Sequence, residues 1–91
     1  MVWIRSLEDN YVNADAIISI TFDQKVNAFV AVVGHKDIRL QHKIYQHQGL
    51  DHLLQGHTSR SEAELLEEMI AHIEKARRTG EPSVLDFTKL L

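Results

Sequence analysis

Histidine is the residue type in this chain whose number and spacing could do chemistry. Six of the 91 residues are histidines, and four of them, His42, His47, His52 and His57, follow one another at intervals of five. Neutral imidazoles bind zinc, nickel or copper, and Asp51 could add a carboxylate ligand, so that no thiolate would be needed. If these side chains converged, the protein would be a histidine-dependent metal-binding or pH-responsive protein.

An interval of five argues against such convergence. It directs successive side chains to opposite faces of a strand and separates them by about 140° around a helix. Histidine sites ordinarily use H-x-H on a strand or H-x-x-x-H on a helix, and neither spacing occurs here. We therefore predict no metal site and no cofactor. His42 shares its parity with Ile38, Leu40 and Ile44, so we expect a partly buried imidazole with its hydrogen bonds satisfied.

Catalysis is not predicted by any group of residues. Hydroxyl side chains in residues 58–61 follow His57, but they are placed to cap a helix, and no G-x-S-x-G sequence frames a nucleophile. Glu67, Glu68 and His72 share neighbouring helix faces without the second histidine of a zinc-protease motif, a pattern typical of a solvated helix surface. The single glycines form no phosphate-binding loop. We expect a protein that is not an enzyme.

Residues 59–80 carry the start, the periodicity and the end of one amphipathic helix. Serines at 59 and 61 each precede a glutamate by three residues, which is the capping-box spacing, and Gly80 and Pro82 end the element. Leu65 falls outside the expected apolar stripe, and we expect Ile70, at the middle of that stripe, to be buried. The stripe comprises Ala63, Leu66, Met69, Ile70 and Ile73.

The chain before this helix has period two, which indicates strands. Even positions of residues 12–22 are apolar, and Asn13 and Asp15 are expected to divide that run into a short and a longer strand. A turn at 23–25 leads into 26–33, which is apolar on both faces and is expected to be a central strand. Residues 34–37 are expected to form a hairpin loop that leads into a returning strand at 38–44.

The remaining segments complete a small α+β domain. Residues 2–5 are expected to form the first strand, with Trp3 as a core anchor. Residues 45–57 are expected to form a loop with a short strand, 83–87 a last strand, and 89–91 a frayed tail. We therefore predict one domain over residues 1–91, an antiparallel or rolled sheet of about five strands packed by one long helix.

Composition narrows the classes of function. The chain has no cysteine, which excludes disulfides and thiolate chemistry, and it has no apolar run long enough to cross a membrane and no signal-peptide pattern, so we expect a cytoplasmic protein. A net charge of −3 makes nucleic acid an improbable partner. Residues 24–60 nevertheless carry five basic and two acidic side chains. Lys36, Arg39 and Lys43, with Tyr45 for stacking, give the weaker hypothesis of nucleic-acid binding.

Short motifs at both ends of the chain resemble a loose group of small bacterial and phage proteins of unassigned function. The matching residues are Trp3-Ile4-Arg5-Ser6, Val12-Asn13, Leu54 through Ser59, Ala63 and Leu66. Gln55 and His57 depart from that pattern, and residues 41–53 resemble an insertion. The resemblance implies a first strand and a C-terminal helix, and it assigns no catalytic or binding residue.

These patterns favour a small interaction or accessory module that presents a sheet edge or a helix face to an unidentified protein partner. We also expect a homodimer, because one helix covers a single face of a sheet, whereas strand 26–33 is apolar on both. Apolar residues outside the helix stripe add surface that could be buried in a contact. They are Leu65, Leu85, Phe87, Leu90 and Leu91.

Overall fold

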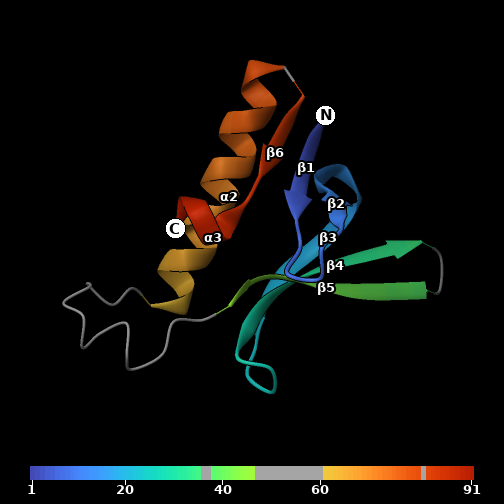
Figure 1. The fold of residues 1–91 in the computed structure, drawn as a ribbon, viewed down its shortest axis with the longest axis vertical. Coiled ribbons are helices and arrows are strands. Elements are labelled where there is room, and N and C mark those ends of the chain that lie inside the picture. The colour runs from blue at the N-terminus through green and yellow to red at the C-terminus, as the bar shows by residue number, and fades with distance from the viewer. Residues whose placement is uncertain (36–37, 47–60, 81) are drawn as a thin grey trace.

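The chain folds into an early part made of strands and a later part dominated by one helix (Figure 1). This computed structural model describes residues 1–35, 38–46, 61–80 and 82–91. The elements within these ranges are β1 (Val2–Arg5), β2 (Tyr11–Asn13), the 3-10 turn η1 (Ala14–Ala16), β3 (Ile17–Asp23), β4 (Ala28–His35), β5 (Ile38–Gln46), α2 (Glu62–Thr79), β6 (Ser83–Leu85) and α3 (Phe87–Leu90). The predicted α+β class is confirmed, with the described strands divided between two small sheets.

The first sheet has the strand order β2-β1-β6. β1 pairs antiparallel with β2 and parallel with β6, and α2 provides the crossover that a parallel pair requires. Val2 and Ile4 are buried, whereas Trp3, on the opposite face of β1, is only half-buried. The prediction that Trp3 anchors the core is therefore wrong, because the alternation of the strand turns its two neighbours inward.

The second sheet has the order β3-β4-β5, and the prediction that the strand around residues 26–33 is central is confirmed. β4 begins at Ala28 and continues to His35, which pairs with Ile38, so two residues assigned to the hairpin loop belong to the strand. Ala28 and Val30 are buried on the face opposite Phe29 and Ala31. The second face of β4 is thus already covered at this end within a single chain.

The predicted division of residues 12–22 is confirmed. Asn13 Oδ1 accepts a hydrogen bond of 2.9 Å from the Asp15 amide, and η1 separates β2 from β3 at that point. The apolar parity expected for β3 fails at Ile18, which is exposed. A β-bulge between Ile17 and Ser19 shifts the register there, so that the even positions no longer share one face through the whole run.

Helix α2 ends at Gly80 as predicted, and its N-cap is Ser61, the second of the two predicted capping serines. Ser61 Oγ accepts from the Glu64 amide at 3.2 Å and also bonds Glu64 Oε1, and Gly80 closes the helix in the left-handed conformation at φ 70°. The predicted buried face is confirmed at Met69 and Ile73 and wrong at Ile70, which is 49% exposed, and at Leu65, which is buried. The buried residues of α2 are Leu65, Met69, Ile73 and Ala76.

The C-terminal segment ends in a helical turn. β6 stops at Leu85, and Asp86 Oδ1 accepts a hydrogen bond of 3.1 Å from the Thr88 amide, which caps α3. Phe87 is fully buried at the start of α3. The predictions of a strand through residue 87 and of a frayed tail at 89–91 are therefore wrong.

One core cluster joins the two sheets to α2 and α3. Its buried members are Val2, Ile4, Val12, Ala14, Phe29, Ala31, Ile44, Tyr45, Leu65, Met69, Ile73, Ala76 and Phe87. Within the described ranges, no helix combines the length and the apolar composition that crossing a bilayer requires. Of the segment predicted as a loop with a short strand, residues 45 and 46 belong to β5 and residues 47–57 lie outside the described residues.

Candidate interaction surface

The outer part of the β4–β5 hairpin, residues 32–35 and 38–41, extends to one side of the molecule and away from α2 (Figure 1); we call it the arm. A bulge in β5 precedes it: Lys43 pairs with Val30 and Tyr45 with Phe29, which leaves Ile44 as the extra residue. Bulges bend a strand and increase its twist. The arm therefore leaves the core at the point where this bulge ends.

Two large aliphatic side chains of the arm are open to solvent. Ile38 is 66% exposed and Leu40 is 57% exposed. Leu40 pairs with Val33, which packs partly against the core cluster, so the exposed side chains continue the core-facing side of the sheet beyond the part that the helix covers. The prediction placed Ile38 and Leu40 on the inner face correctly, but this part of the inner face is not covered.

The opposite side of the arm is polar except at its base. Arg39 and Gln41 are exposed there, and they pair with Gly34 and Val32. Exposed Ile18 lies across Gly34, because a Cβ at position 34 would collide with Ile18 Cδ1. A larger residue at position 34 would have to displace the end of the exposed Ile18 side chain. The arm thus has one face formed by Ile38 and Leu40 and an opposite face on which Arg39 and Gln41 are exposed and Ile18 lies beside Gly34.

The outer edge of β5 is hydrogen-bonded at Lys43. The Leu7 amide donates to the Lys43 carbonyl oxygen at 2.8 Å, and the Lys43 amide donates to Glu8 Oε1 at 3.2 Å. Residues of a strand direct their N–H and C=O groups alternately to the two sides. Since Lys43 bonds outward, Gln41 and Arg39 also direct theirs outward, where no described backbone or side chain binds them.

The loop that covers Lys43 is organised by Ser6. The Ser6 side chain is almost fully buried, and its Oγ accepts from the amides of Glu8 at 3.1 Å and Asn10 at 3.3 Å and also bonds Asn10 Oδ1. The Ser6 amide donates to the Asn10 carbonyl at 2.8 Å. Asp9 adopts a positive φ of 60° within this loop. Residues 6–10 are thereby held in the position from which Leu7 and Glu8 reach the edge of β5.

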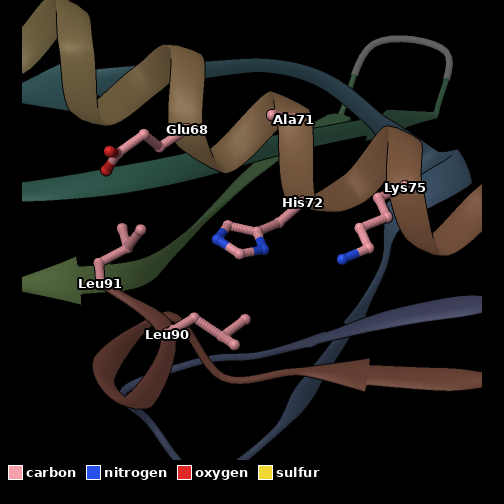
Figure 2. A pocket seen from close by; sticks show the side chains of 6 residues that line it. All are labelled: Glu68, Ala71, His72, Lys75, Leu90 and Leu91. Carbon is pink, nitrogen blue, oxygen red and sulfur yellow. The ribbon is translucent and has the colours of Figure 1, made fainter.

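A cavity of about 230 Å³ lies between α2 and α3. Figure 2 shows His72 pointing from α2 into this space, with Glu68 and Lys75 from the same helix and Leu90 and Leu91 opposite. The rings of His72 and Phe87 are 6.3 Å apart between centroids. Glu68 and His72 are half-buried, so the prediction of a wet helix surface holds for exposed Glu67 and is wrong for these two. The volume is below the roughly 300–1,000 Å³ of ordinary ligand sites.

The histidines expected to be dispersed are only partly described. His42 is half-buried opposite core residue Ala31, as predicted, but its buried Nδ1 atom has no hydrogen-bond partner, so the expectation of a satisfied imidazole is wrong for that atom. In the described ranges, no three His, Cys, Asp or Glu side chains gather as metal ligands. His47, His52, His57 and Asp51 lie outside the described residues.

The residues of the nucleic-acid hypothesis do not form a stacking surface. Tyr45 is buried, and its ring lies 6.0 Å from that of Phe29 between centroids, so it is not available to a base. Arg39 is exposed, and Lys43 is half-buried on the same face of β5. Lys36 lies outside the described residues, as do the capping candidates at 58 and 59. Ser61, the remaining candidate nucleophile, is the N-cap of α2.

No protein-family model, curated protein or solved structure matches this chain. Function must therefore be inferred from the surface itself. Sequence reasoning missed the arm because it assigned Gly34 and His35 to a loop and treated alternation as a sign of burial. Leu40 lies opposite Val33 because the strand continues past Gly34, and period two alone does not predict that register.

Proposed function

We propose that this protein is a small, non-enzymatic interaction module that binds another protein through the arm. One observation carries the proposal: Ile38 and Leu40 are exposed on a strand whose next outward-facing backbone groups, at Arg39 and Gln41, have no partner among the described residues. An edge with free N–H and C=O groups is a template for a further strand, and neighbouring side-chain contacts give that pairing its specificity.

The construction of the arm supports a binding role. Aliphatic side chains that are more than half exposed contribute little to the stability of the monomer, so their burial energy is available to a partner. The arm is continuous with a strand whose inner end is fixed in the core by Ile44 and Tyr45, and this anchoring limits the conformational entropy lost on binding. A cytoplasmic setting is part of the proposal, since a chain without cysteine gains nothing from an oxidising compartment.

Site-specific photocrosslinking in cells tests this function. A photoreactive amino acid in place of Gln41 lies on the outer strand of the arm, at its inner end. The same amino acid in place of Arg78, an exposed residue near the far end of α2, is the matched control. We expect protein adducts from position 41 and none from position 78. The proposal is wrong if position 41 yields no protein adduct, or if both positions yield the same adducts.

A further inference from the structure

We infer that the partner of the arm is a second copy of this chain, which pairs antiparallel along the outer edge of β5. This inference rests on the proposed function, since it assigns the occupant of the same surface. The resulting dimer would contain one continuous sheet with the order β3-β4-β5-β5-β4-β3. Three properties of the edge support a second copy as the partner. They are the backbone groups that are free to bond, the loop that ends the free edge, and the side chains that would face each other across the new strand pair.

The bonded groups of Lys43 limit the pairing at the inner end of the arm. Lys43 already bonds Leu7 and Glu8, so a second strand cannot use its outward groups. In the described part of β5 the free outward groups are those of Arg39 and Gln41. In an antiparallel ladder, two opposed residues with outward groups exchange both N–H and C=O. A short segment with two such residues is complementary to itself when one pairs with the other.

This requirement selects one register. Arg39 lies opposite Gln41 of the partner subunit, Gln41 lies opposite Arg39 of the partner subunit, and the two-fold axis passes between the Leu40 residues. A register centred on Gln41 would place Arg39 opposite Lys43 of the partner subunit, whose groups are taken and whose charge has the same sign. A register centred on Arg39 would oppose the two arginines directly, which is destabilising. The register centred on Leu40 avoids both conflicts.

The side chains agree with this register. On the aliphatic face Leu40 contacts Leu40 of the partner subunit, in a pair whose backbones do not bond across the interface and whose side chains are therefore closest. Ile38 lies opposite His42 of the partner subunit. Each of these aliphatic side chains, more than half exposed in the monomer, gains a cross-strand neighbour on the outer side of β5. The contact is short and belongs to the size class of weak interfaces, so the dimer should form in a concentration-dependent way.

Sedimentation equilibrium at micromolar to near-millimolar protein tests the dimer. We expect the wild-type mass to approach twice 10.4 kDa with increasing concentration. Leu40→Lys should remain at the monomer mass, and Val84→Lys, at an equally exposed strand residue of the other sheet, should behave as the wild type. A wild type that stays monomeric throughout overturns the inference. So does a Leu40→Lys variant that associates as strongly as Val84→Lys.

Single cysteines test the register, because the natural chain has none. Leu40→Cys should oxidise to a covalent dimer, since Cα atoms in such a pair are about 4.5 Å apart, within the range of disulfides. Arg39→Cys and Gln41→Cys should each oxidise slowly alone, because like residues are offset beyond about 7 Å, and should crosslink when mixed. Non-reducing electrophoresis measures the covalent dimer formed by each of the three variants and by the mixture of the last two. Fast oxidation of Arg39→Cys alone, or none of Leu40→Cys, overturns the register.

The two levels of the proposal fail differently. If the chain is monomeric and position 41 crosslinks to other proteins, the arm binds a different partner, and only the inference of a second copy is overturned. If position 41 gives no adduct with any protein, including this one, both the proposed function and the inference are wrong. Adducts of twice the monomer mass support both.

Discussion

Truncation of Met69 and of the adjacent Ile70 should have clearly different effects on stability. Met69 is fully buried in the cluster between α2 and the two sheets, so Met69→Ala should cost about 2–5 kcal/mol of the free energy of unfolding. Ile70 is 49% exposed. Ile70→Ala removes three carbon atoms, each of which contributes roughly 0.8 kcal/mol when fully buried. Because the side chain is half exposed, the expected loss in the free energy of unfolding is about 1 kcal/mol. The free energy of unfolding of the whole domain is expected to be only roughly 5–14 kcal/mol.

Urea unfolding followed by circular dichroism measures this comparison. The slope of the free energy against urea should be unchanged in both variants, since each keeps the same fold, and the midpoint should fall much further for Met69→Ala. Glu67→Ala, an exposed position on the same helix, is the control and should be almost silent. Equal losses at 69 and 70, or a larger loss at 70, would refute the assignment of the buried face of α2.

Three further results follow from the structure. Gly80→Ala should lower the free energy of unfolding by about 1–2 kcal/mol in the same assay, because Gly80 has φ 70°. Nothing lies close to an added Cβ, so backbone strain is the whole effect. A silent substitution would contradict this. Ser6→Ala leaves the amides of Glu8 and Asn10 without their acceptor, so the free energy of unfolding should fall by about 1–3 kcal/mol. Hydrogen exchange at the Leu7 amide should also become faster. Unchanged exchange would show that Ser6 does not hold the loop. Excess zinc at micromolar concentration should leave the melting temperature unchanged, and calorimetric binding that is lost in His47→Ala or His52→Ala would revive the metal hypothesis.

Local signals were sufficient to predict where α2 begins and ends. Ser61 acts through a hydrogen bond and Gly80 through its backbone conformation, and each effect is confined to one turn of the chain. Such local effects can be predicted from the sequence. The buried face is set by contacts with strands distant in sequence. Leu65 and Ile70 lie at opposite margins of the apolar stripe, about 140° apart around the helix. Only the position of the sheets decides that Leu65 rather than Ile70 turns inward. A local signal for α3 was also present at Asp86, which precedes Thr88 as a cap.

For the strands, too, contacts between residues far apart in the sequence could not be predicted from local patterns. The apolar pattern located β1, β3, β4 and β5, but it could not show that β1 pairs with β6 across the helix, because that pairing joins the two ends of the chain. Bulges at Ile18 and Ile44 were also not predictable from period two, since each is one residue that breaks the period. The candidate surface depends on these features. The arm projects because of a bulge, and its free edge begins where Leu7 stops covering β5.

Backbone hydrogen exchange at the arm, measured residue by residue in dilute and in concentrated protein, tests the central claim most directly. In dilute protein the amides of Leu40 and His42, which face β4, should be protected, and those of Arg39 and Gln41 should exchange rapidly. In concentrated protein Arg39 and Gln41 should become protected, and Lys43, already bonded to Glu8, should change little. Arg39 and Gln41 amides whose exchange is slow in dilute protein, or does not slow with concentration, would contradict the account.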